Sequence, residues 1–318
     1  MTRAASKATL LPLLAWLLAW QPLPAAVVPD LYVAQVPAAG LSGPALDGAF
    51  ALALDQVLVK VTGRRDAGAD PARRRAVGAP ATLVRQYQPA PGGQLRVSFE
   101  PAALLRGLDA ARLPVWADDR PLTLVVLPPE PAPADPAAPT AGAVSLRQAF
   151  ETVAAIRGLP VAFGPPAQAA DATLEGRPAP TGGAGLWQWT LTRGDERQQW
   201  TGDLAEGAHG LADRLADRLA GIAAEGGPLL VRITGVTDFE TYGRLQAYLR
   251  SVGLIRSAEL RGIEDGALVY GLEVRGDVAR LNAAFALRRL LEPVGAGGAG
   301  ELLYRVVPDT GPVAAREP

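Results

Sequence analysis

The order of strands and helices in residues 227–308 constrains the fold more than any other feature of the chain. Asp265-Gly266 lies between two apolar runs and is a hairpin signal. Four apolar runs predict strands and two amphipathic runs predict helices, in chain order 229–236, 237–251, 254–260, 267–274, 277–291 and 302–307. The resulting order, β-α-β-β-α-β, is typical of the split-βαβ, ferredoxin-like fold.

The ends of these two helices carry capping signals. Thr237 and Glu240 have the spacing of a capping box, which predicts Thr237 as the first cap, and Asp277 is expected to cap the second helix. Residues 295–300 match G-x-G-x-x-G, but this run follows a helix and leads into a strand. A dinucleotide loop has the opposite order, so we expect a connector there.

The length of 318 residues suits three units of about 100 residues each. We expect an N-terminal α/β unit at 27–118, a middle unit at 119–226 and the ferredoxin-like unit at 227–308. The fold class is therefore α+β, with several small α/β sandwich units. Further predictions are a Pro/Ala loop at 128–142, a short helix at 82–87, a closing helix that begins near Leu211, and a disordered tail at 309–318.

The N-terminus has the pattern of an export signal. Arg3 and Lys7 precede the apolar run Thr9–Trp20, and small residues follow at Ala25 and Ala26. This pattern predicts a signal peptide at 1–26 and a periplasmic location, with an uncleaved anchor as the alternative. No later run has the length and apolarity of a transmembrane helix.

The composition removes most reactive chemistry. The chain has no cysteine and one histidine, His209, which we expect in a solvated loop before a helix. Thiolate and multi-histidine metal sites are therefore excluded, and we predict no enzyme, no catalytic residue, no cofactor and no metal. The net charge of −1 gives no basic surface for a nucleic acid.

Four residues are candidates for binding. Trp187 and Trp189 share one face of an expected strand, where they could stack on sugars or lie in a core. Arg64 and Arg65 begin a basic cluster that continues at 73–75, which could meet an acidic partner or stay solvated.

Several runs resemble one family of exported proteobacterial proteins, the domain of unknown function 2066. The resemblance implies export but no activity and no site residues that could be transferred. The middle segment is similar in element order to domains of flagellar assembly protein T, the Tol-Pal translocation protein and lipoprotein activators of peptidoglycan synthases, which implies docking to proteins. The runs that resemble the first family are 31–37 (LYVAQVP), 53–67, 95–116 and 120–127 (RPLTLVVL).

We therefore expect a binding or assembly module of the cell envelope that acts through contacts with other envelope proteins. One alternative is a protein that binds peptidoglycan or another glycan through Trp187, Trp189 and Trp116. A second alternative is an envelope hydrolase that uses the carboxylates of Asp118 and Asp119.

Overall fold

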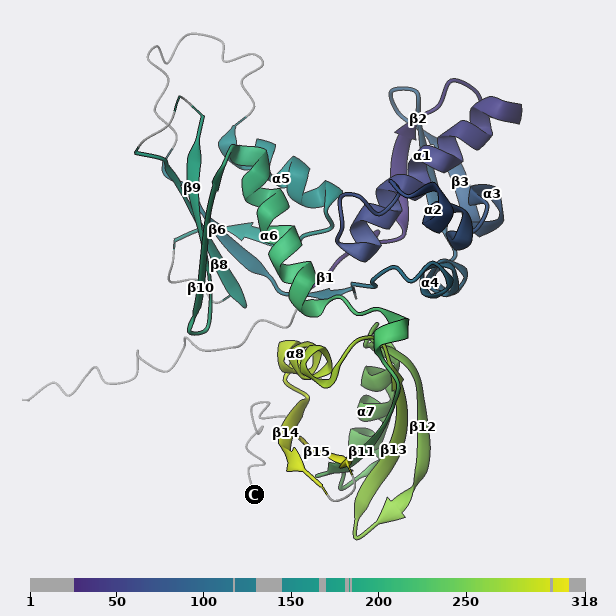
Figure 1. Cartoon of the computed structure of the whole chain (residues 1–318), viewed down its shortest axis with the longest axis vertical. Helices are drawn as coiled ribbons and strands as arrows, with labels where there is room; N and C mark the ends of the chain where they lie inside the picture. Colours follow the sequence, from purple (N-terminus) through teal and green to yellow (C-terminus); the bar gives the residue numbers. More distant parts are fainter. Residues whose placement is uncertain are drawn as a thin grey trace, which may run out of the picture.

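The computed structural model describes residues 26–116, 118–129, 145–165, 170–180, 183, 185–297 and 300–308. Within them the chain forms three mixed units of helices and sheets, each with its own hydrophobic core (Figure 1). The predicted α+β class with small sandwich units is confirmed. The predicted signal peptide up to residue 25, the Pro/Ala loop from residue 130 and the tail lie outside the described residues.

The N-terminal unit is a three-stranded antiparallel sheet, in the order β2-β4-β3, covered by helices. Apolar residues spaced three and four apart on α1 (Gly43–Thr62) are buried, and the helix ends at Gly63, whose φ of 69° suits glycine. The other elements are β2 (Val33–Pro37), α2 (Pro71–Val77), α3 (Pro80–Leu83), β3 (Val84–Ala90), β4 (Gln94–Phe99) and α4 (Pro101–Ala110).

The expected helix at 82–87 is wrong. Only α3 is helical there, and from Val84 onward the chain is strand β3, because its backbone pairs with β4. Pairing in a sheet outweighed the local helical signal. The basic run at 73–75 lies in α2, which Asp70 caps by accepting from the amides of Ala72 and Arg73.

The middle unit is a five-stranded sheet in the order β10-β9-β8-β6-β7, with α5 and α6 packed together on one face (Figure 1). Strand β6 runs parallel to β7 and β8, and the remaining pairs are antiparallel. The elements are β6 (Thr123–Val126), α5 (Leu146–Ile156), β7 (Val161–Phe163), β8 (Ala172–Pro178), β9 (Trp187–Arg193), β10 (Glu196–Gly202) and α6 (Leu204–Leu219).

Helix α6 begins seven residues before the expected Leu211, so His209 lies inside a helix and not in a loop. Asp203 caps the helix by accepting from the amide of Glu206. Two glycines, Gly207 and Gly210, lie in the first turns of this helix. Both are required by close packing, because a Cβ on Gly207 would stand 2.3 Å from the Trp189 ring, and one on Gly210 would stand 2.6 Å from Trp200.

The C-terminal unit has the predicted element order and the strand neighbours of a ferredoxin-like sheet, and it adds one strand, β14, that reverses the direction of the last strand. Its sheet order is β12-β13-β11-β15-β14, with β11 parallel to β15, and α7 and α8 cover one face (Figure 1). The added strand, β14, pairs with β15 where a connector was expected. The elements are β11 (Pro228–Thr234), α7 (Phe239–Ser251), β12 (Ile255–Glu264), β13 (Ala267–Val274), α8 (Val278–Arg288), β14 (Leu291–Ala296) and β15 (Leu302–Val306).

The turn and cap signals of this unit are confirmed with one correction. Asp265 and Gly266 both have positive φ, as a two-residue hairpin turn requires, and Asp277 caps α8. The cap of α7 is Asp238, which accepts from the amide of Thr241, and not the expected Thr237. The Asp carboxylate one position later reaches the same unpaired amides.

The three units are joined through short crossings. Strand β1 (Ala26–Val27) pairs with β5 (Asp119–Arg120), and Val115 bridges to Gly221 just before the turn η1 (Ala223–Glu225) that leads into β11. Side chains also cross, since Trp116 and Leu287 lie in the core of the middle unit. The units therefore share buried contacts and are not joined by linkers alone.

Candidate functional site

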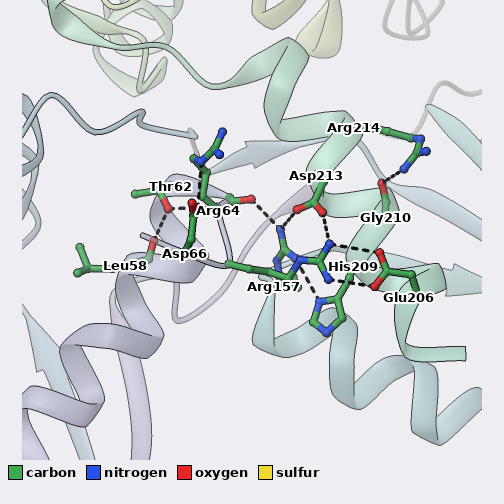
Figure 2. A network of polar contacts seen from close by, with 12 residues as sticks. Leu58, Thr62, Arg64, Asp66, Arg157, Glu206, His209, Gly210, Asp213 and Arg214 are labelled. Carbon is green, nitrogen blue, oxygen red and sulfur yellow. Dashed lines mark hydrogen bonds and ion pairs between the residues drawn. The ribbon is translucent and has the colours of Figure 1, made fainter. Parts of the chain in front are cut away.

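Arg157 is the centre of the contact between the N-terminal and middle units. Its side chain is 0% exposed, and one guanidinium nitrogen donates to the Gly63 carbonyl at 2.7 Å and to Asp213 at 2.6 Å. A second nitrogen lies 3.1 Å from Nδ1 of His209 (Figure 2). The planar fork of arginine suits this position because it can satisfy several acceptors at once.

Helix α6 supplies the acceptors of this network from one face. Glu206, His209 and Asp213 are three and four residues apart, so their side chains project to the same side. Arg65 joins from the N-terminal unit and donates to Glu206 at 2.9 and 3.2 Å and to Asp213 at 2.7 Å. Two arginines and two carboxylates thus alternate across the contact (Figure 2).

The pKa shifts in this network favour a neutral His209 and an ionised Asp213. Burial lowers the pKa of His209, and the nearby cations of Arg157 and Arg65 lower it further. For Asp213, burial raises the pKa, but hydrogen bonds and charge from Arg157 and Arg65 outweigh it, so the pKa is lowered. At neutral pH a neutral imidazole therefore lies beside charged arginines and an ionised carboxylate.

A second buried arginine, Arg120, reinforces the same contact. It donates to the carbonyls of Arg157, Gly158 and Lys60 at 3.0, 2.8 and 2.5 Å, and lies 4.0 Å above the Trp116 ring. These carbonyls end α5 and α1, where the helix dipoles place negative charge. Burial lowers the pKa of Arg120 to about 9, so it stays charged at neutral pH.

The C-terminal unit is held by arginines that pair with carboxylates. Arg275 donates to both oxygens of Asp109 at 2.8 and 3.0 Å and to the Gly253 carbonyl at 2.8 Å. Arg288 of α8 pairs with Asp119 in β5. The bidentate pair of Arg275 with Asp109 fixes the orientation of the two side chains as well as their distance.

A cleft of about 670 Å³ opens where the three units meet. Its floor includes apolar side chains such as Leu113 and Ile222. Cavities of this size are typical of binding sites. The rim carries equal numbers of basic and acidic residues, drawn from all three units and the connector: Arg64, Arg73, Arg112, Arg280, Asp66, Asp70, Asp217 and Glu225.

The predicted arginines have separate roles. Arg64 lies on the rim of the cleft, is exposed and pairs with Asp66 at 3.2 Å. Arg65 points to the contact with α6 and is occupied there by two carboxylates. Of these two residues, only Arg64 therefore lies on the cleft, where it pairs with Asp66.

The predicted tryptophans lie in the core of the middle unit. Trp189 is 0% exposed and Trp187 9% exposed, and their rings stack at 5.7 Å between centroids. Trp189 donates to the Asp203 carbonyl at 3.2 Å, which holds the start of α6, and Trp116 is also buried. None of these rings presents a face on which a sugar could stack.

The carboxylates of Asp118 and Asp119 do not converge on a shared cleft. Asp119 is buried and paired with Arg288, whereas Asp118 lines a separate small pocket beside Tyr32. Across the described ranges, no group of three or more His, Asp or Glu side chains could hold a metal ion. Nor does any described helix have the length and apolar character needed to cross a membrane.

Sequence reasoning missed the two buried arginines, Arg120 and Arg157. Arginine is rarely buried, so nothing in their local sequence marked them. The signal that could have found the site is the spacing of Glu206, His209 and Asp213, which aligns three polar groups on one helical face.

Comparison with the curated proteins and with the solved structures gives no match. The resemblance to the domain of unknown function 2066 is wrong, because the family that matches is a different one. The runs that carried the resemblance form strands, part of helix α1 and the whole of helix α4, whose apolar spacing many α/β units share. The match is to the domain of unknown function (DUF8605), over residues 25–117, which is the N-terminal unit and less than half of the chain.

Proposed function

We propose that this chain is a non-enzymatic binding module of the bacterial cell envelope, which holds a segment of a partner protein in the cleft between its three units. The observation that carries the proposal is the cleft itself, about 670 Å³ in volume and lined from all three units. The export pattern of Arg3, Lys7 and Thr9–Trp20 supports the envelope location.

The charge pattern of the cleft favours a protein segment over an anionic ligand. A phosphorylated ligand or nucleic acid would meet as many carboxylates as guanidinium groups on the rim. An apolar floor inside a rim of mixed charge is instead the usual anatomy of a protein interface. Such a rim selects a partner by complementary charges of both signs.

Some rim charges are available for a partner. Arg64 pairs with Asp66 in the loop before α2 at 3.2 Å, and Arg73 of α2 pairs with the capping residue Asp70 at 3.5 Å. Arg112 and Glu225 have no ion pair among the described residues. A partner could therefore pair with both without first breaking an existing ion pair.

The contacts around the cleft support a preformed site. Buried Arg157 and Arg120 fix one wall, and the pair of Arg275 with Asp109 fixes the unit that carries Arg280. A binding surface that is already ordered loses less conformational entropy when a partner binds.

Photo-crosslinking from the cleft tests the proposal. A photoreactive amino acid at Ile222, on the cleft floor, is irradiated in envelope extract, with Tyr87 on the N-terminal sheet as the control position. We expect a discrete protein adduct from residue 222 alone, weakened at least tenfold by Arg112→Glu and unaffected by Arg177→Glu, which changes a remote exposed ion pair. An equal adduct from both positions would contradict the proposal, as would an adduct of glycan alone.

A further inference from the structure

Strand β12 is the outer edge of the C-terminal sheet. It pairs with β13 on one side, and no strand within the described part of the chain pairs with its other side. An open edge of this kind offers unpaired N–H and C=O groups to a further strand. Proteins usually block such edges with charges and bulges, and β12 carries both.

The four charges of β12 lie on the face of the sheet opposite the helices. Glu259 pairs in register with Gly271, and Arg261 lies over Gly271 while forming an ion pair with Glu259 at 3.0 Å. Arg256 lies 3.8 Å from Glu273, and Glu264 binds Arg232 at 2.6 Å. In chain order the face therefore reads positive, negative, positive, negative.

The other face of the same edge is apolar and uncovered. Leu260 is 41% exposed and Ile263 is 69% exposed. They face Tyr270 and Leu268 of β13, whose side chains lie in the core beneath the helices, so the two exposed residues extend that core outward. Large apolar side chains grouped at an open edge are typical of an interaction surface.

The charge pattern is complementary to itself about Leu260. In an antiparallel pair related by a two-fold axis at this residue, positions equally far before and after Leu260 face each other. Glu259 then faces Arg261 of the second strand, and Arg256 faces Glu264. No like charges meet, and Leu260 faces its own copy on the apolar side.

We propose that β12 pairs antiparallel with β12 of a second copy, so that two five-stranded sheets join into one across the two-fold axis at Leu260. The bulges at Arg256 and Arg261 and the alternating charges oppose pairing with an arbitrary strand. A copy of the same strand supplies the matching charges. This surface is separate from the cleft, so either proposal can fail without the other.

The mass of the purified full chain in solution, measured by light scattering over a range of concentrations, tests the pairing. We expect a dimer for the native chain and a dimer at least roughly tenfold weaker for Glu259→Arg or Arg261→Glu, since each places like charges opposite one another. Because both side chains are exposed, folding should be unaffected, and Arg177→Glu, a reversal elsewhere, should leave the dimer intact.

Mixing the two single variants separates contacts between copies from contacts within one chain. The Glu259→Arg chain then faces the Arg261→Glu chain with opposite charges, so we expect a mixed dimer, and the double variant should also pair. A native chain that stays monomeric at every concentration would overturn the proposal. So would single variants that dimerise as the native chain does, or a mixture that remains monomeric.

Discussion

The two junctions of this protein use arginine in different ways. Between the N-terminal and middle units, Arg157 and Arg120 are fully buried and donate to backbone carbonyls at the ends of helices. At the C-terminal unit, Arg275 pairs with the carboxylate of Asp109. Carbonyl acceptors belong to the backbone and do not titrate, so the first junction depends in part on the fold itself, beside its carboxylates Glu206 and Asp213. At the second junction, the arginines reach the acidic side chains of Asp109 and Asp119.

Replacing Arg157 should have the largest effect. Arg157→Met keeps much of the volume but leaves the Gly63 carbonyl, Asp213 and His209 without their shared donor. We expect a loss of about 3–5 kcal/mol in the free energy of unfolding, measured by denaturant titration. Arg177→Met, at an exposed pair, should change it by less than about 0.5 kcal/mol. A loss below about 1 kcal/mol for Arg157→Met would mean that this junction does not stabilise the fold.

Replacing Arg275 should cost less and act locally. Asp109 keeps a cation nearby in Arg275→Met, because Arg256 lies 3.4 Å away, so we expect a loss of about 2 kcal/mol. Hydrogen exchange should rise in α4 and at the start of β12, where the junction lies. If hydrogen exchange rose as much throughout the middle unit as in α4 and β12, the two junctions would not differ as described.

Two helical glycines test whether close contact with a tryptophan ring determines the residue needed in α6. Gly207→Ala in α6 should destabilise the protein by about 1–3 kcal/mol, because its Cβ would stand 2.3 Å from the Trp189 ring. Gly243→Ala in α7 has open space and should stabilise by about 0.5–1 kcal/mol, since alanine favours helix. Thermal unfolding of both variants tests this contrast. The same sign for both changes would show that ring contact does not fix α6.

Acid should weaken the first junction by a smaller amount through His209. Its pKa is lowered in the folded state, so below pH 6.5 the unfolded chain binds a proton that the folded chain resists. Stability should therefore fall as the pH drops below about 6.5, and His209→Gln should flatten that part of the profile. Denaturation midpoints between pH 7.5 and 5 measure the effect. An unchanged profile in the variant would place the acid sensitivity elsewhere.

The sequence predicted the C-terminal unit best because its signals are local. The turn at Asp265-Gly266, the cap at Asp277 and the apolar run of β13 each act within a few residues, and all three were confirmed. Strand β14 was missed because Pro293 and the glycines after it suggest a loop. Only pairing with β15, a contact between segments, makes this run a strand.

The candidate site could not be predicted in the same way because it depends on contacts distant in sequence. Arg65 and Asp213 meet across 148 positions of the chain, and Arg275 and Asp109 across 166. Gly207 and Gly210 of α6 are explained by close contact with the rings of Trp189 and Trp200, which lie on other elements of the middle unit. Arg64 and Arg73 were identified from the sequence as members of a basic cluster and lie on the cleft.

The buried contacts between the three units should hold them as one rigid body around the shared cleft. Because the chain has no cysteine, spin labels can be placed in pairs at exposed Gln88 in the N-terminal unit and Glu240 in the C-terminal unit, diluted with unlabelled chain. Electron spin resonance should give one narrow distance distribution, which broadens in Arg157→Met and Arg275→Met. A broad or multiple distribution in the otherwise unaltered chain would contradict the claim.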